Sequence, residues 1–562
     1  PDHKAVIALL EKMQKSHGPS YWKLNTSLLN EDRYCHGVKN VITSTLNTLS
    51  DRIRIHFLWE LIKIKIKEFS ITYSIVRAQK WKNDISIAEK KIQKLDEEID
   101  IIDCLVTKNV LIQERSNLKK DIDTYYAEKS KGAYVRSRAK WIESGEKSTS
   151  YFLKLEKRHA KFNSIDKITK DDGTEMTSDE DILQEARIFY HNLYSSSNPN
   201  ERDIDSFLDQ LPAIPTLSQE DMLLCEDEIT ENECLYAIKS LRSNKSPGLD
   251  GIPIEFYRKF WPDIGQFLVK LYNESYSKGE LPDSMNLAVL NLIFKKTDRT
   301  KFKNYRPLSV STTDYKILAF VLARRLQSVI NKIISPDQVG YIKGRYIGTN
   351  IRQVLDLIEY AEQYKTGGIL LFLDFEKAFD SLEWPFMLAC LKRFGFGPHF
   401  LKWIQILYKA PSVTIKINGW MSDQVTLSRG VRQGCPVSAL LFIISTEMLA
   451  IKIRTSDIIG IKMKPCHSDK EFKISQYADD SLLFLANEKE IPKAINIINE
   501  YSKVSGQRLN IPKTEVLGIG IYKTLHYHKK YGINWCKPED TVRCLGIHIG
   551  HDPGVCRKKN WD

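Results

Sequence analysis

Two short stretches carry aspartates whose type and spacing suit metal-dependent chemistry. In the first, an apolar run from Ile369 to Leu373 is followed directly by Asp374. The run is too short to span a membrane and is typical of a strand buried on both faces. In the second, two apolar arms flank Ala478-Asp479-Asp480, which predicts a hairpin with carboxylates at its tip. Both stretches would place hard oxygen ligands on a rigid support.

Carboxylate ligands of this kind favour Mg²⁺, which keeps open positions for substrate phosphates. Two such ions can clamp the attacking and leaving oxygens of an in-line phosphoryl displacement. A single Asp after a strand is usually a turn or N-cap residue, which is the simpler interpretation of each Asp alone. Adjacent like charges repel unless a cation lies between them, so the pair Asp479 and Asp480 favours the metal site.

The whole chain has the size and charge of a multidomain protein with a polyanionic partner. Its 562 residues suggest about three or four modules, and its formal net charge is +12. The 10 cysteines are scattered without fixed short spacings, as in a reduced intracellular protein. No run of about 18 apolar residues occurs, so we expect no membrane span. The start has no signal-peptide pattern and no initiator Met, and we expect a longer protein at both ends.

Residues 36–160 contain almost no Gly or Pro and are predicted to be helical. Apolar side chains recur at alternating spacings of four and three, which indicates the seam of a coiled coil or helical hairpin. The seam residues are Ala88, Ile92, Leu95, Ile99 and Ile102.

The end of this helical region, residues 134–159, interleaves basic and aromatic side chains. Basic residues neutralise phosphates and aromatic faces stack on unpaired bases, so we expect contact with nucleic acid. A solvated helix face would explain the Lys and Arg residues equally well. The candidate contacts are Arg136, Arg138, Lys140, Trp141 and Lys147.

Further elements are predicted along the chain. Thr-Glu-Asn-Glu, beginning at Thr230, resembles a capping box that would start a helix. The other expected elements are an amphipathic helix over 179–194, a strand over 287–296, a helix over about 313–334 and a hairpin-like stretch over 544–550.

Six segments, taken in order, resemble the reverse transcriptase of non-LTR (LINE-type) retrotransposons. The wordings Phe-Glu-Lys-Ala-Phe-Asp, Arg-Gln-Gly-Cys-Pro and Tyr-Ala-Asp-Asp are highly specific together. The resemblance covers about residues 230–550. The segments are Asn244–Gly251, Asn304–Ser309, Leu373–Asp380, Arg432–Pro436, Tyr477–Asp480 and Lys513.

The resemblance implies an α+β fold: a right-hand polymerase with fingers, palm and the start of a thumb, behind a long α-helical arm. No nuclease activity is expected, because Asp2-His3 resembles only the last motif of an apurinic-type endonuclease. The implied domains are the endonuclease remnant (1–16), the helical arm (17–160), an N-terminal extension of the polymerase (161–235), fingers and palm (236–550) and a truncated thumb (551–562).

The implied activity is RNA-directed DNA polymerisation in target-primed reverse transcription. Two Mg²⁺ ions, or Mn²⁺, would be held by Asp374, Asp479 and Asp480, with help from the backbone carbonyl of Phe375. The primer 3′-hydroxyl would attack the α-phosphate of a dNTP, and catalysis would be mostly positioning and charge neutralisation. Lys513 would be a proton donor near the leaving pyrophosphate.

The resemblance also implies a set of substrate-binding residues. Arg306, with Lys295 or Lys296, would grip the triphosphate, because a guanidinium binds phosphate oxygens bidentately. Phe379 would block a ribose 2′-hydroxyl and Gln433 would line the nucleotide pocket. Phe379 as a plain core residue, Lys513 as a plain surface cation and a structural role for Arg306 stay open. The stretch Leu545–Gly550, with Leu545 and Gly546 at its start, would hold the primer end.

The expected partners are template RNA, primer or target DNA and dNTPs, in a ribonucleoprotein of the nucleus and cytoplasm. The oligomeric state is not predicted. A group II intron maturase and a catalytically silent nucleic-acid-binding remnant are the alternatives. A zinc site at Cys544, His548, His551 and Cys556 is not expected, because the spacing is not the usual pattern.

Overall fold

The computed structural model describes residues 18–102, 104–137, 164–212, 214–295, 297–463, 470–525 and 530–561. Several predicted residues lie outside these ranges: segment 1–16, Arg138, Lys140, Trp141, Lys147 and Lys296. Arg136 falls at the end of a described helix, and its side chain is not described. No helix in the described ranges combines the length and apolarity that crossing a membrane requires.

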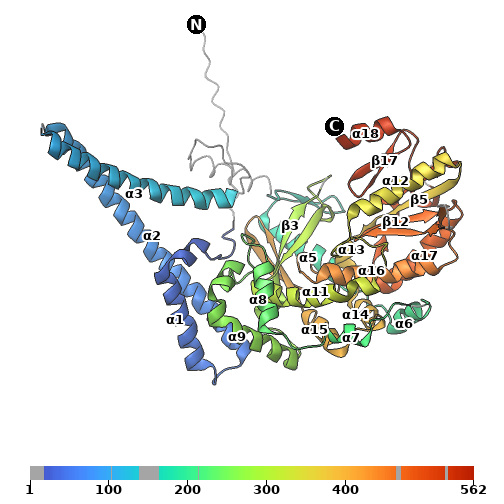
Figure 1. Ribbon diagram of the computed structural model, residues 1–562, viewed down its shortest axis with the longest axis horizontal. Helices are drawn as coiled ribbons and strands as arrows, with labels where there is room; N and C mark the ends of the chain where they lie inside the picture. Colours follow the sequence, from blue (N-terminus) through green and yellow to red (C-terminus); the bar gives the residue numbers. More distant parts are fainter. Residues whose placement is uncertain are drawn as a thin grey trace, which may run out of the picture.

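The predicted helical arm is present as two long helices that project from the body (Figure 1). Helix α2 (Ile55–Ile101) runs outward, and α3 (Leu105–Ser137) returns beside it. Ala88, Leu95 and Ile99 are buried in the seam, while Ile92 and Ile102 are half-buried. Ion pairs such as Arg115–Asp96, at 2.6 Å, flank it. The prediction of a helical hairpin is therefore confirmed over the described residues.

The base of the arm is embedded in the body rather than resting on it. In α2, Trp59 and Ile62 are fully buried. Trp59 Nε1 donates to Asp314 Oδ2 at 2.7 Å, and Lys63 Nζ lies 3.3 Å from the same oxygen. Asp314 lies in the first turn of α11 (Thr313–Ile333), so the first part of α2 is joined to the body by buried polar contacts.

A five-stranded sheet carries the predicted aspartates. Its strand order is β11-β12-β5-β14-β15, and β5 pairs antiparallel with both β12 and β14. Alternate side chains of β5 enter two different cores, because successive residues of a strand face opposite sides. The strands are β11 (Ile474–Tyr477), β12 (Asp480–Leu485), β5 (Gly367–Leu373), β14 (Glu515–Gly520) and β15 (Asn534–Trp535).

One face of this sheet packs on helices and the other on a helix and a hairpin. Leu371 and Leu483 belong to the large core that includes the helix residues Leu441 and Ile498. Leu370, Leu482 and Phe484 share a smaller core with helix residue Leu357 and hairpin residue Val542. The covering elements are α16 (Ser438–Thr455), α17 (Glu490–Ser505), α12 (Ile347–Gln363), β16 (Thr541–Cys544) and β17 (Ile547–Gly550).

A second sheet has the order β4-β3-β7-β8, and α5 (Asp179–Tyr194) covers it. Ile182, Ala186 and Tyr190 of α5 pack with Leu290 and Ile415 of the sheet in a separate core. The strands are β3 (Leu287–Phe294), β4 (Tyr305–Val310), β7 (Ser412–Ile417) and β8 (Trp420–Thr426).

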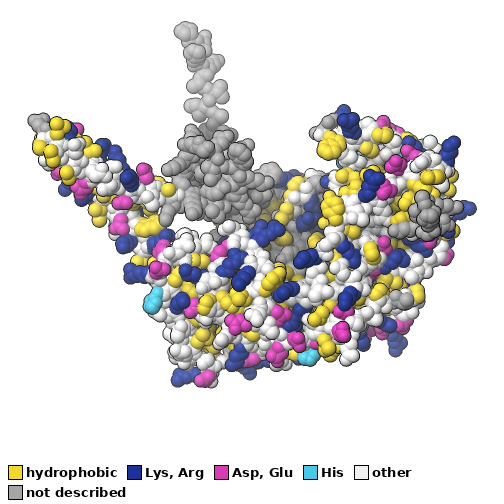
Figure 2. Space-filling view, viewed as in Figure 1, with side chains coloured by type: hydrophobic (Ala, Val, Ile, Leu, Met, Phe, Trp, Pro, Cys, Tyr) yellow, Lys and Arg dark blue, Asp and Glu magenta, His cyan; other side chains and the backbone are white. Residues whose placement is uncertain are grey.

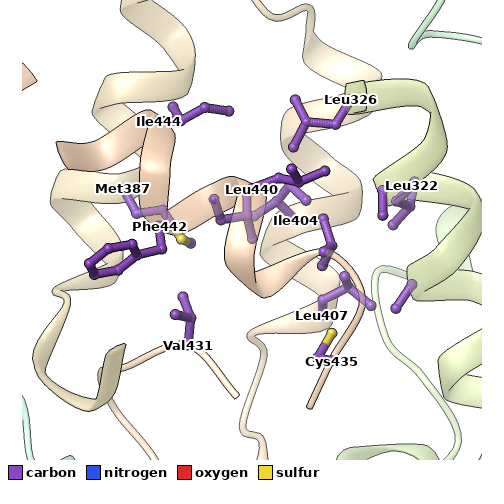
Figure 3. Close-up of a cluster of buried hydrophobic side chains, with 14 of the residues drawn as sticks. Leu322, Leu326, Met387, Ile404, Leu407, Val431, Cys435, Leu440, Phe442 and Ile444 are labelled. Atoms are coloured by element: carbon purple, nitrogen blue, oxygen red, sulfur yellow. The ribbon is translucent and has the colours of Figure 1, made fainter. Parts of the chain in front are cut away.

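Most of the remaining helices pack in the large core that also holds one face of the five-stranded sheet. Figure 3 shows its centre, where Leu322 and Leu326 of α11 face Ile404, Leu407 and Leu440. The helices include α1 (Asp32–Leu49), α6 (Glu201–Asp209), α7 (Gln219–Leu223), α8 (Glu231–Ser240), α9 (Ile254–Lys278), α10 (Asp283–Asn286), α13 (Ala378–Ser381), α14 (Trp384–Arg393), α15 (Pro398–Leu407) and α18 (Pro553–Trp561).

The local sequence predictions agree closely with these elements. Helix α5 has the predicted bounds, α11 ends one residue earlier than expected, and β3 covers most of the predicted strand. Thr230 is the N-cap of α8, and its hydroxyl and the Glu233 carboxylate form the predicted capping box. These successes reflect signals that act over a few residues, namely caps, turns and hydrophobic periodicity.

Candidate active site

The sheet brings the three predicted aspartates to one edge. Asp374 follows the last residue of β5, and Asp479 and Asp480 lie at the tip of the β11–β12 hairpin. Strands β5 and β12 are neighbours, with Ser481 opposite Leu373, so the hairpin tip lies beside the end of β5. Ala478 turns the chain with φ of 58°. Both predictions from the aspartate stretches, a buried strand and a hairpin, are confirmed.

These carboxylates repel one another. Burial, together with the negative charges of Asp479 and Asp374, raises the pKa of Asp480 to about 6. Within the described ranges, no three His, Cys, Asp or Glu side chains already converge on a metal position. The donor set nevertheless fits a divalent cation, because oxygen ligands suit Mg²⁺ and an ion between like charges would relieve their repulsion.

A buried glutamine holds the hairpin tip in place. Gln338 Oε1 accepts from the Ala478 N–H at 2.9 Å, and Gln338 Nε2 donates to the Ala478 carbonyl at 3.4 Å. On either side, Val339 N donates to Gln476 O and Gln476 N donates to Asp337 O, both at 2.9 Å. Gln338 is fully buried. Sequence reasoning gave this residue no role, because nothing local distinguishes it from other loop glutamines.

We expect Gln338→Ala to loosen the aspartate hairpin without unfolding the chain. The variant leaves the buried Ala478 N–H without its partner, which costs about 1–3 kcal/mol locally. Hydrogen exchange measured by mass spectrometry should show amides of peptides spanning 476–480 exchanging roughly ten- to a hundred-fold faster. Gln363→Ala, at an exposed position ending α12, is the control. Unchanged exchange in Gln338→Ala would show that the backbone pairing alone holds the tip.

Basic side chains gather beside the carboxylates. Burial lowers the pKa of Lys295, and Arg306 lowers it further while Asp479 opposes the shift. Burial, together with the charges of Lys295, Lys513 and Arg306, lowers the pKa of Lys377 to about 8. The charge of Asp380 opposes this shift. Since their charges act on one another, these four cationic side chains lie close together, near Asp479. They are Lys295, Arg306, Lys377 and Lys513. The structure therefore brings together Lys295, Arg306 and Lys513, which the sequence analysis singled out separately.

Lys377 is an addition to the predicted set. Its Nζ donates to the Tyr305 carbonyl at 2.7 Å, which ties it to the strand that carries Arg306. Its backbone is left-handed, with φ of 46°, so the side chain leaves the Asp374 strand in an unusual direction. The motif Phe-Glu-Lys-Ala-Phe-Asp contained this lysine, but only the turn of the backbone reveals which way it points.

Phe379 and Gln433, which the sequence analysis predicted to line the nucleotide pocket, lie on the same side of the site. The Phe379 ring stacks on Phe442, with centroids 4.2 Å apart and planes 9° apart. Tyr341 meets Phe379 edge-on at 6.3 Å, and burial, followed by the charge of Asp479, raises the Tyr341 pKa. Gln433 Nε2 donates to both carboxylate oxygens of Asp380, at 3.1 and 3.0 Å. Phe379 is half-buried, so it is both packed and available to a ligand.

The hairpin-like stretch expected over 544–550 is present, but its first strand already begins at Thr541, and the hairpin reaches the carboxylates. Leu545 and Gly546 form its turn, both with positive φ, between β16 and β17. Burial, together with the charge of Asp480, raises the pKa of Cys544 to about 11, so the turn end of the hairpin lies near the aspartates. His548 Nδ1 pairs with the Thr541 hydroxyl at 3.1 Å. In the described part of the chain these residues do not form a zinc cluster.

Comparison with known proteins identifies this arrangement. Residues 293–549 match the family described as "Reverse transcriptase (RNA-dependent DNA polymerase)". They form a reverse transcriptase domain. The chain is 29% identical over 549 residues to "Transposon TX1 uncharacterized 149 kDa protein" from Xenopus laevis, covering 98% of this chain and 41% of the relative.

Two relatives from Drosophila melanogaster match shorter parts. The chain is 28% identical to "Retrovirus-related Pol polyprotein from type-2 retrotransposable element R2DM" over 52% of this chain and 26% of the relative. It is 24% identical to "RNA-directed DNA polymerase from mobile element jockey" over 57% of this chain and 34% of the relative. The chain thus spans less than half the length of each. The predicted resemblance to non-LTR retrotransposon reverse transcriptases, and the α+β right-hand polymerase fold, are confirmed.

The reverse transcriptase domain does not supply its site alone. Tyr194 of α5 lies well before residue 293, yet its hydroxyl donates to Asp380 at 3.2 Å. Trp59 and Lys63 of the arm likewise contact Asp314 inside the domain. The domain boundaries and the roles of individual residues predicted from the sequence stay predictions.

Proposed function

We propose that the chain is the RNA-directed DNA polymerase of a LINE-type retrotransposon, transferring nucleotides from dNTPs to a primer 3′-hydroxyl. The single observation that carries this is the juxtaposition of Asp374, Asp479 and Asp480 with a cluster of four cations. A polymerase requires both the carboxylates and the cations. Its active site has to neutralise the charge of the triphosphate and hold the attacking and leaving oxygens in line. The family match to residues 293–549 supports the same reaction.

In the proposed mechanism each cation has a substrate oxygen to hold. Arg306 and Lys295 bind the triphosphate, and Lys377 lies close enough to both to assist. Lys513, whose charge acts on Lys377, would donate a proton to the leaving pyrophosphate, because a neutralised leaving group departs more easily. The β16–β17 hairpin positions the primer end through its Leu545–Gly546 turn. Lys296 would add to the triphosphate site, and it lies outside the described residues.

Asp374, Asp479 and Asp480 would hold the divalent cations, with the Phe375 carbonyl as a further oxygen. Two Mg²⁺ ions, or Mn²⁺, would supply charge neutralisation at the attacking and leaving oxygens. The chain contributes the rigid placement of the ligands: β5 holds Asp374, and Gln338 fixes the turn before Asp479.

Primer extension on an RNA template with dNTPs and Mg²⁺ tests this function directly. The chain should extend the primer, and Asp479→Asn should not. Template-dependent binding with no extension under any divalent cation would favour the alternative of a catalytically silent remnant. A maturase-like polymerase is disfavoured by the wording of the motifs and by the long arm, which extends away from the body (Figure 1).

Template RNA and primer or target DNA are the proposed partners, and target-primed synthesis in a ribonucleoprotein of nucleus and cytoplasm is the proposed setting. Lys and Arg side chains are spread over the arm and over the face of the body that Figure 2 shows. The formal net charge of +12 supports a polyanionic partner. Such binding releases counterions, so it should weaken steeply as salt rises.

We expect Phe379→Val to admit ribonucleotides. Stacking on Phe442 holds the Phe379 ring rigidly, so its removal opens space beside the proposed sugar site. The discrimination ratio, kcat/KM for a dNTP over that for the matching rNTP, should fall by roughly 10²-fold. Single-nucleotide incorporation measures the ratio, and dNTP incorporation by the same variant is the internal control. An unchanged ratio would leave Phe379 as a core residue only.

A further inference from the structure

Helix α5 ends against the nucleotide side of the site. The Tyr194 carbonyl accepts from the backbone N–H groups of Ser428 and Arg429, at 3.0 and 3.2 Å. The next residues are anchored on Glu383, a fully buried carboxylate that accepts from Ser196 Oγ at 2.6 Å and Ser197 N at 2.9 Å. These contacts hold the end of α5 between the Phe379–Glu383 segment and the loop that leads to Gln433.

From this position Tyr194 reaches Asp380. The Tyr194 hydroxyl donates to Asp380 Oδ1 at 3.2 Å, and the Tyr194 and Asp380 side chains are 4% and 2% exposed. Burial raises the pKa of Asp380 to about 6, while Lys377, Tyr194, Gln433 and Lys295 oppose the rise. Asp380 is therefore a carboxylate at neutral pH, kept so by these partners.

Asp380 in turn decides how Gln433 points. A carboxylate only accepts hydrogen bonds, so the Gln433 amide has to turn its NH₂ group toward it. Nε2 is 3.1 and 3.0 Å from the two Asp380 oxygens. The Gln433 backbone is pinned as well, since its carbonyl accepts from Ser309 N of β4 at 2.8 Å. Oε1 accepts no hydrogen bond from the residues that the structure describes, so it is the accepting end of a half-buried side chain.

We infer that Tyr194, through Asp380, is a positioning residue that sets Gln433 as a hydrogen-bond acceptor for the incoming nucleotide. The inference rests on the proposed polymerase function. It makes α5, which precedes the matched reverse transcriptase region, part of the nucleotide pocket. The chemical group recognised is a donor on the nucleotide, either a sugar hydroxyl or a base amino group.

The same helix offers a matched control. Tyr190 is one turn earlier, is fully buried and stacks with Tyr194 at 6.2 Å. Its hydroxyl is buried without a hydrogen-bond partner in the described part of the chain. Packing of α5 therefore does not itself require a hydroxyl at such a position. Tyr190→Phe and Tyr194→Phe each remove one buried hydroxyl, and only the second removes a contact to Asp380.

Steady-state incorporation of a single dNTP tests the inference. Tyr194→Phe should raise KM for the dNTP about 5-fold and leave kcat within about 2-fold, because positioning affects binding more than the chemical step. Tyr190→Phe should match the wild type in both. Asp380→Asn should raise KM at least about 10-fold, since an amide at position 380 no longer forces the Gln433 NH₂ group toward it. Equal KM values in Tyr194→Phe and Tyr190→Phe would overturn the inference.

A second measurement separates this inference from the proposed function. A primer ended by a dideoxynucleotide cannot be extended, so retention of the next dNTP in the complex reports binding alone. Wild-type and Tyr190→Phe chains should retain it, and Tyr194→Phe should need about 5-fold more dNTP for half-retention. Extension and retention that are normal in Tyr194→Phe would reject only the inference. A wild-type chain that neither extends a primer nor retains a dNTP would reject the proposed function and the inference together.

Discussion

Asp479→Asn is expected to reduce RNA-templated primer extension by at least about 10³-fold, roughly 4 kcal/mol of transition-state stabilisation. The substitution keeps the size of the side chain and removes one of three charges that would hold the divalent cations. The effect should appear in the single-turnover rate at saturating dNTP. The single-turnover rates of Asp374→Asn and Asp480→Asn should be reduced by the same factor. Double variants should be only slightly slower than the single variants, because ligands of one site act as a unit.

Two controls accompany this prediction. Asp423→Asn changes a carboxylate that is 84% exposed, with Arg187 3.9 Å away, and should extend the primer like the wild type. Affinity for the RNA–DNA duplex should be close to normal in Asp479→Asn, which would locate the defect in the chemical step. Extension within 10-fold of the wild type in Asp479→Asn would remove that residue from the proposed metal site.

Lys63→Met is expected to destabilise the junction between arm and polymerase by about 3–5 kcal/mol. Lys63 and Asp314 are 4% and 0% exposed, and the pair is 3.3 Å apart. Burial opposes both charges, yet the attraction between them holds the pKa of Asp314 below and that of Lys63 above the ordinary values. Asp250 is close by, and burial together with Asp314 raises its pKa. Without Lys63, Asp314 loses its ion-pair partner, and Lys316 is the further cation that acts on Asp314 and Asp250.

Denaturant unfolding followed by tryptophan fluorescence should show the loss, since Trp59 donates to the same Asp314. Lys67→Met, an exposed position on the same helix, should change stability by no more than about 0.5 kcal/mol. Adding Asp314→Asn to Lys63→Met should restore a large part of the loss, because the orphaned charge is then gone. Equal stability of Lys63→Met and Lys67→Met would show that apolar packing alone fixes the arm.

The sequence by itself determined the main elements and singled out the three aspartates that we propose as metal ligands. The run Ile369–Leu373 and the arms around Asp479 are local patterns, and a buried strand and a hairpin follow from them with little help from the rest of the chain. The seam of the arm and the Thr230 capping box are local in the same sense. Caps, turns and periodicity act over a few residues, so one sequence is enough to read them.

Only the tertiary structure decided which distant side chains meet. Tyr194 and Asp380 are 186 positions apart, Gln338 and Ala478 are 140 apart, and Lys63 and Asp314 are 251 apart. No local pattern encodes such partners, because they depend on how sheets and helices pack after the elements have formed. For this reason Gln338, Lys377 and Tyr194 escaped the sequence analysis, although they surround residues that it identified. The aspartates are evident in the sequence, while the contacts that orient their surroundings arise from packing.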